Sequence, residues 1–281
     1  MTPPTLCDPT DDAALRRDGY VVVDLISPEV VAELLDLCRS LHPEPASAWE
    51  SDFYSPSAEV KRTVHERLAA GFAPAVERVF VGHHTVLHNF IMNWPGSDGG
   101  LVLHQHSSVV DERRFRSVLI WCALTDATEE NGTLHVVPGS HLVQVGPRPE
   151  RSQSWCHAHE RQLLADHLVS VPVRAGQALI FDNQLLHCSF PNATDEPRVS
   201  AAAIVIPDAA EPLFFEAVGS SAVQVHRLDP AFFLTHEAGD LEWARPEGLE
   251  LIEERAWSPV VIEASEIASM FGPGTCRHEP S

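Results

Sequence analysis

Positive charge is scarce in this chain of 281 residues. It carries 19 Lys and Arg against 40 Asp and Glu, its formal net charge is −21, and Lys61 is its only lysine. A protein that binds nucleic acid needs a basic face for the phosphate backbone, so we expect no nucleic-acid partner. The remaining cations are arginines, whose planar guanidinium suits the two-point recognition of a carboxylate.

The sequence also lacks the marks of exported and membrane proteins. Its six cysteines form no C-x-x-C pair and are irregularly spaced, which favours reduced thiols. No apolar run approaches the roughly 18 residues of a membrane-spanning helix. The first residues, MTPPTLCDPTDD, contain neither the basic nor the apolar segment of a secretion signal. We expect a cytoplasmic protein with no membrane partner.

Apolar residues are plentiful enough for a sizeable core. They make up 44% of the chain, which excludes a disordered protein. Residues 1–75 favour helices. Ser27 followed by Pro28 is typical of a helix start, and the segment 55–72 predicts a further helix that ends near Gly71.

From about residue 76 to residue 210, short β-like runs alternate with turn clusters rich in Gly, Pro, Asn and Asp. Such a series is typical of an antiparallel sandwich or barrel. One long polar interruption, from Leu142 to His167, predicts a lid over an active site. Residues 211–281 have the character of a tail packed on the barrel. We therefore expect one mainly β domain over residues 1–281.

Two histidines in the stretch LHQHSSVVDE, His104 and His106, are candidates for binding one metal ion. On an extended strand, residues i and i+2 point to the same face. With 16 His in the chain, however, roughly one His-x-His is expected by chance. A second one is present at His157 and His159. The pair alone does not establish a metal site.

Four stretches resemble the phytanoyl-CoA dioxygenase family, a branch of the non-haem iron, 2-oxoglutarate-dependent oxygenases. LHQHSSVVDERRFRSVLIWCALTDA is similar to the family's His-Gln-Asp and the Trp-bearing strand after it. ENGTLHVVPGSH is close to its Asn-Gly-x-Leu-x-x-x-Pro-Gly-Ser-His. AGQALIFDNQLLHCSFPN contains the distal His187, and Arg198 follows eleven residues later. Each stretch is weak alone, but their common order over about residues 90–206 is specific.

The resemblance implies a double-stranded β-helix, a jelly-roll barrel with flanking N-terminal helices and iron(II) in its mouth. In the family, two His and a carboxylate hold the metal and leave positions open for 2-oxoglutarate and O2. The match implies His104 and His187 as metal ligands. It also implies that Arg198 and Ser189 bind the distal carboxylate of 2-oxoglutarate.

Two more residues match cofactor-binding positions of the family. Trp121 lies on the strand that often lines the cofactor pocket, and Asn93 lies where relatives often have a polar cofactor contact. The residues also support Arg198 independently. It follows an acidic-Pro turn and enters an apolar strand, which predicts an inward-facing guanidinium that needs a carboxylate partner.

His106 occupies the position of the family's carboxylate ligand. Asp111 is no replacement, because relatives with a normal Asp also tend to carry the Val-Asp-Glu that follows. A halogenating enzyme is disfavoured, because an imidazole fills the room that chloride needs. A histidine introduced at position 106 by substitution would give the same sequence as a natural histidine there.

Three interpretations of this departure stay open. The first is a three-histidine iron site, formed by His104, His106 and His187, that still uses 2-oxoglutarate. This interpretation is favoured because Arg198 and Ser189, which the resemblance implies as 2-oxoglutarate-binding residues, are retained. The second is a three-imidazole site for zinc, nickel or copper that works without 2-oxoglutarate, either with O2 or as a Lewis acid. The third is a non-catalytic member of the family that binds a ligand.

The first interpretation is the one on which we base our expectations. It predicts an iron(II) enzyme that hydroxylates or otherwise oxidises a small molecule with 2-oxoglutarate and O2. By analogy with the family, the substrate is expected to be a natural product or an amino-acid-like compound.

Overall fold

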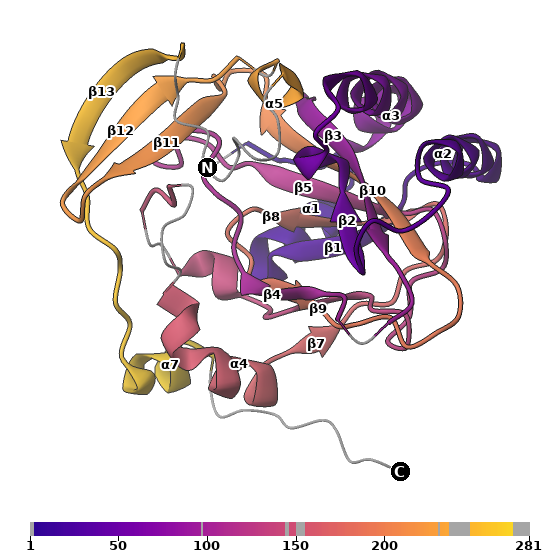
Figure 1. The fold of residues 1–281 in the computed structure, drawn as a ribbon. Coiled ribbons are helices and arrows are strands. Elements are labelled where there is room, and N and C mark those ends of the chain that lie inside the picture. Colours follow the sequence, from indigo (N-terminus) through magenta and orange to yellow (C-terminus); the bar gives the residue numbers. More distant parts are fainter. Residues whose placement is uncertain are drawn as a thin grey trace.

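The computed structural model describes residues 3–96, 98–143, 146–149, 155–229, 231–235 and 248–271. Its strands form antiparallel sheets (Figure 1). The largest sheet has the order β1-β8-β5-β10-β3-β2, with the bounds Tyr20–Asp24, Gln177–Asp182, Val118–Ala123, Arg198–Pro207, His83–Asn93 and Trp49–Ser51. A second sheet, β4-β9-β6-β7, consists of Leu101–His104, His187–Ser189, Leu134–Val136 and Val169–Ser170. The mainly β architecture is as predicted.

Helices dominate the N-terminal part, also as predicted: α1 (Pro9–Asp18), α2 (Pro28–Leu41) and α3 (Ala58–Val79). Ser27 is the N-cap of α2. The predicted end of α3 near Gly71 is wrong. A Cβ atom at Gly71 would lie 3.3 Å from Leu34 Cδ1, so this glycine lets α3 pack closely against α2 and does not end the helix.

The six-stranded sheet has two apolar faces, and β10 shows how they alternate. Val199, Ala201 and Val205 join the core beneath α2 and α3. Ala202 belongs to a second core on the opposite face, with Ile204 packed against it. Because side chains alternate along a strand, Arg198 lies on the same face of β10 as Ala202 and Ile204, and all three line one cavity.

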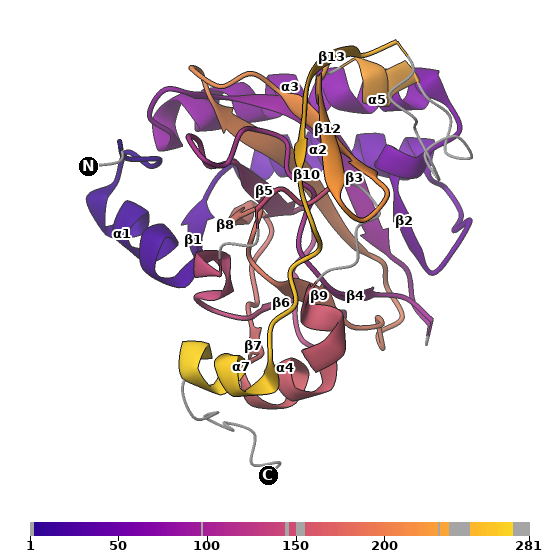
Figure 2. The same ribbon diagram turned by 90° about the vertical axis from the view of Figure 1, so that its left-hand side faces the viewer.

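The chain after β10 contains more structure than the tail expected from the sequence. Strands β11 (Leu213–Val218), β12 (Ala222–Arg227) and β13 (Glu250–Ala256) form a third antiparallel sheet. The short helix α5 (Phe232–Thr235) contributes Phe232 and Phe233 to a cluster with Leu87 of β3. Helix α7 (Ala264–Phe271) lies next to α4 (Glu160–Asp166) in both ribbon views (Figures 1 and 2).

The predicted lid lies only partly among the described residues, since 144, 145 and 150–154 are outside them. Its described C-terminal part comprises the 3-10 helix Trp155–His159 and α4. Trp155 and Leu163 are buried in a cluster with Leu103 of β4. Trp155 Nε1 also donates a hydrogen bond to Gln105 Oε1 (3.1 Å). This part is a packed wall beside β4, and a lid formed by the rest stays a prediction.

Among the described helices, none combines the length and the apolar character that crossing a membrane requires. The five described cysteines are free thiols, and Cys276 lies outside the described residues.

Candidate metal centre and co-substrate pocket

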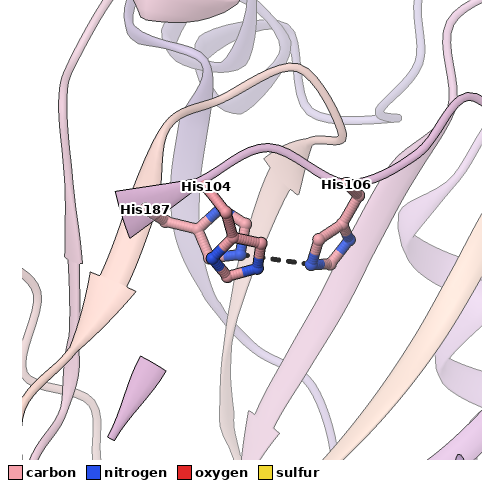
Figure 3. A group of neighbouring side chains, drawn as sticks. All are labelled: His104, His106 and His187. Carbon is pink, nitrogen blue, oxygen red and sulfur yellow. Dashed lines mark hydrogen bonds between the residues drawn. The ribbon is translucent and has the colours of Figure 1, made fainter. Parts of the chain in front are cut away.

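Three histidines point toward one another (Figure 3), and all three line one cavity. His104 ends β4 and His187 begins β9, and the two are paired across the sheet. His106 reaches the cavity from irregular backbone after β4, and not as a strand neighbour of His104 as the sequence suggested. One ring nitrogen from each histidine lies within 4.8 Å of the others. The Nε2 atoms of His187 and His106 are 3.1 Å apart.

Backbone carbonyls orient two of the imidazoles. The Nδ1 atom of His104 is 2.8 Å from the Val102 carbonyl oxygen, and Nδ1 of His187 is 2.9 Å from that of Leu185. A carbonyl oxygen only accepts, so each Nδ1 carries the proton and each Nε2 keeps its lone pair. A carbonyl partner on the remote nitrogen is the usual support of a metal-binding histidine.

Burial keeps all three imidazoles neutral. Desolvation lowers the pKa of His104 and His187 below the usual histidine value and lowers the pKa of His106 to about 3. The neighbouring imidazoles lower the pKa of His106 and His187 further. A neutral imidazole can bind a metal without first losing a proton. The cluster therefore has the protonation state that a divalent transition metal needs.

The main chain of His106 is held from both sides. Its N–H donates to the Asn183 carbonyl oxygen (3.0 Å), and its own carbonyl accepts from Arg148 Nε (2.7 Å). Arg148 also forms a two-point ion pair with Glu112, at 2.7 and 2.8 Å. Arg148 could not be singled out from the sequence, because it lies in the polar interruption far from His106 along the chain.

Arg198 is buried in the same cavity as the histidines. Its exposed fraction is 1%, and its Nε and Nη1 atoms have no hydrogen-bond partner among the described residues. Desolvation lowers the pKa of its guanidinium to about 9. A buried charge without a partner is costly. The guanidinium is therefore suited to an anion that the described part of the chain does not supply.

Two other predicted cofactor residues lie around this guanidinium. Trp121 places its ring 5.1 Å from the Arg198 guanidinium carbon, within cation–π distance. Ser189 of β9 accepts a hydrogen bond from the Leu101 N–H (3.1 Å), which leaves its hydroxyl proton free to donate. Both residues line the cavity.

Asn93 is not brought into the cavity lining. It pairs with Arg198 across β3 and β10, but its side-chain amide donates to the Phe190 carbonyl oxygen (3.0 Å). A Cβ at Gly132 would lie 2.4 Å from the Asn93 Nδ2 atom. Asn93 thus packs into the turn around Gly132. Its predicted contact with the cofactor receives no support from this position.

The cavity has a volume of about 340 Å³, which is in the range of small-molecule sites. Asp111 does not take part in it, because its carboxylate pairs with Arg113 at 2.8 and 2.9 Å. Among the residues that the structure describes, no carboxylate therefore belongs to the histidine cluster.

Comparison with known proteins agrees with this arrangement. The family model "Phytanoyl-CoA dioxygenase (PhyH)" matches residues 15–200. "Ectoine dioxygenase" of Sphingopyxis alaskensis is 30% identical over 222 residues, which are 67% of this chain and 72% of that protein. The crystal structure of the non-heme alpha ketoglutarate dependent epimerase SnoN from nogalamycin biosynthesis superposes with a TM-score of 0.51 at 25% identity, covering 74% of this chain and 84% of SnoN.

A more distant structure has the same fold. The non-heme alpha ketoglutarate dependent carbocyclase SnoK, also from nogalamycin biosynthesis, has a TM-score of 0.53 at 19% identity and covers 75% of this chain and 89% of SnoK. The expected double-stranded β-helix is confirmed.

Proposed function

The chain belongs to the phytanoyl-CoA dioxygenase family of non-haem iron, 2-oxoglutarate-dependent oxygenases, and on that premise we propose that it oxidises a small molecule at a three-histidine iron site. The observation that carries the proposal is the buried Arg198 guanidinium, which shares a cavity with three neutral imidazoles and has no carboxylate partner among the described residues. A dicarboxylic co-substrate supplies that partner.

The polar residues of the candidate site have distinct parts in this proposal. His104, His106 and His187 would hold iron(II) through their Nε2 atoms. Arg198 would bind the distal carboxylate of 2-oxoglutarate, with the Ser189 hydroxyl as a second donor. When bound, iron(II) with 2-oxoglutarate and O2 supplies oxidation of a C–H bond, coupled to loss of CO2 from the 2-oxo acid.

The protein's own contribution is to orient these groups and to exclude water. The carbonyls of Val102 and Leu185 orient two of the imidazoles. Trp121 and Phe181 form apolar walls beside the polar groups. A water-poor cavity strengthens the attraction between Arg198 and a carboxylate.

The third histidine changes the charge of the centre. A neutral imidazole replaces the carboxylate that relatives have, so the metal centre keeps one more positive charge. This should strengthen its hold on the anionic 2-oxoglutarate and raise the metal's reduction potential. Arg198 and His106 would thus act together on the same co-substrate.

The substrate is proposed to be a small metabolite, such as a natural product or an amino-acid-like compound. Relatives named ectoine dioxygenases and an epimerase from nogalamycin biosynthesis support this class.

The test is an anaerobic titration of the metal-free protein with Fe(II) and then with 2-oxoglutarate. We expect one iron per chain and a weak visible charge-transfer band that appears only with both additions. A protein that retains zinc and gives no band would favour a Lewis-acid enzyme that does not use 2-oxoglutarate. Binding of neither metal nor 2-oxoglutarate would favour a ligand-binding protein.

A further inference from the structure

The cavity extends beyond the histidines to an aromatic mouth. The Phe53 ring lies 5.0 Å from Tyr54 and 5.2 Å from Phe233, and Trp49 lies 6.2 Å from Tyr54, all between ring centroids. These residues line the same cavity as the histidines and Arg198. Such a mouth offers flat apolar surfaces for a ring or a hydrocarbon skeleton.

Charge is almost absent from this cavity. Among the described lining residues, Arg198 is the only one with a formal charge, and no Asp, Glu or Lys is present. In the proposed function, Arg198 is already used by 2-oxoglutarate. A carboxylate or an ammonium on the substrate would therefore be buried without a partner in this lining, which costs binding free energy.

The metal centre adds a reason against cationic substrates. A divalent iron, the Arg198 guanidinium and a dianionic co-substrate leave one net positive charge when all three ligands are neutral imidazoles. A cation close to this centre is repelled, and the aromatic mouth alone offers only a weak attraction for it.

Asn89 and Ser51 form one polar pair among the neutral polar residues that line the cavity. Asn89 Nδ2 donates to Ser51 Oγ (2.8 Å) and to the Phe90 carbonyl oxygen (3.2 Å). Because a carbonyl only accepts, the amide orientation of Asn89 is determined. No described residue donates to Asn89 Oδ1. Ser51 Oγ already accepts from Asn89 and from the Phe53 N–H, so its hydroxyl proton is free to donate.

Trp49 contributes an aromatic ring to the cavity from the same strand as Ser51. Trp49 Nε1 is buried and has no hydrogen-bond partner among the described residues. Trp49 and Ser51 both belong to β2 and line the cavity. The Asn89–Ser51 pair therefore offers one acceptor and one donor to a neutral polar group such as a hydroxyl or a carbonyl.

We infer that the substrate of the proposed oxygenase is an uncharged, mainly apolar molecule with a hydroxyl or carbonyl group that Asn89 and Ser51 recognise. This inference rests on the proposed function and narrows its substrate class. It favours a neutral natural product over an amino-acid-like zwitterion.

Four probes with one skeleton test the inference: 2-naphthalenemethanol, 2-ethylnaphthalene, 2-naphthoate and (2-naphthylmethyl)ammonium. Their binding to the anaerobic protein with Fe(II) and 2-oxoglutarate is measured by equilibrium dialysis and naphthalene fluorescence. We expect the alcohol to bind at least about tenfold more tightly than either charged probe. A charged probe that binds as tightly as the alcohol, or an alcohol that does not bind at millimolar concentration, overturns the inference.

The charge-transfer band separates this result from a failure of the proposed function. If the band is missing, the iron–2-oxoglutarate proposal has failed. The same dialysis on the metal-free protein then still decides whether the cavity prefers neutral probes.

Variants of Asn89 test the polar contact. We expect Asn89→Leu to weaken binding of the alcohol by about tenfold and to leave 2-ethylnaphthalene unchanged. Equal losses for both probes would mean that Asn89 only packs. Asn89→Asp should shift the preference towards the ammonium probe. The control is Gln224→Leu, which removes an exposed amide on β12 that pairs with Glu254.

Discussion

The guanidinium of Arg148 binds the main-chain carbonyl of His106 at 2.7 Å and at the same time pairs with Glu112. The side chains of this ion pair are only 9% and 11% exposed. A hydrogen bond from a buried charged group to the backbone restricts the loop that carries His106. Arg148 is therefore a positioning residue for the third imidazole.

Replacement of Arg148 should make the position of the His106 imidazole less well defined. We expect Arg148→Met to lower the affinity for Fe(II) or Co(II) by about tenfold to 100-fold, as losses of supporting contacts to metal ligands do. Metal affinity and the energy of the metal's visible absorption bands are the readouts.

Glu112→Gln separates positioning from stability, because it weakens the ion pair and keeps the donor to His106. It should lower the free energy of unfolding and change metal affinity much less. The control Arg113→Met removes an ion pair at an exposed arginine. Equal losses of metal affinity in Arg148→Met and Glu112→Gln would contradict a specific role for Arg148.

Arg198→Met should have opposite effects on stability and on binding. Without 2-oxoglutarate the change removes an unpaired buried charge, so the free energy of unfolding should rise by about 2 kcal/mol. The affinity for 2-oxoglutarate should fall about 100-fold, while iron binding stays the same. Chemical denaturation and the charge-transfer titration measure the two effects. A variant that is less stable and still binds 2-oxoglutarate would refute the assignment.

His106→Asp restores the carboxylate that relatives have. We expect the variant to bind iron and to bind 2-oxoglutarate about tenfold more weakly, because the centre loses one positive charge. The control Val81→Asp adds the same charge at an exposed site. It should change neither the affinity for iron nor the affinity for 2-oxoglutarate. If the variant binds 2-oxoglutarate as tightly as the native protein, the neutral ligand is not what strengthens binding of the anion.

His88 should make stability depend on pH. It is buried beside His65, with their Nδ1 atoms 3.3 Å apart. Burial lowers its pKa to about 3. Between that value and the usual histidine pKa, the unfolded chain binds a proton that the folded chain does not. Stability is therefore complete at neutral pH and falls on acidification, by about 1.4 kcal/mol per pH unit for this residue.

The measurement is urea denaturation of the native protein and of His88→Phe between about pH 7 and about pH 5. The variant should lose less stability on acidification. An identical pH dependence in both proteins would mean that His88 does not titrate as its burial requires.

Much of the fold could be predicted because its signals are local. Helix starts such as Ser27–Pro28 and the β-like run that forms β10 depend on neighbours in the chain. The end of α3 could not be predicted. Whether Gly71 ends a helix or lets it pack depends on Leu34, which belongs to another helix.

The sequence by itself determined the residue types at the candidate site, because its resemblance to the dioxygenase family singled out His104, His106, His187 and Arg198. Only the tertiary structure decided how these side chains are arranged and what supports them. The contact of Arg148 with His106, the unpaired Arg198 guanidinium, the turn position of Asn93 and the Asn89–Ser51 pair all join segments distant in the chain. Such contacts depend on packing and desolvation in three dimensions. Neither produces a periodic pattern of residues in the sequence.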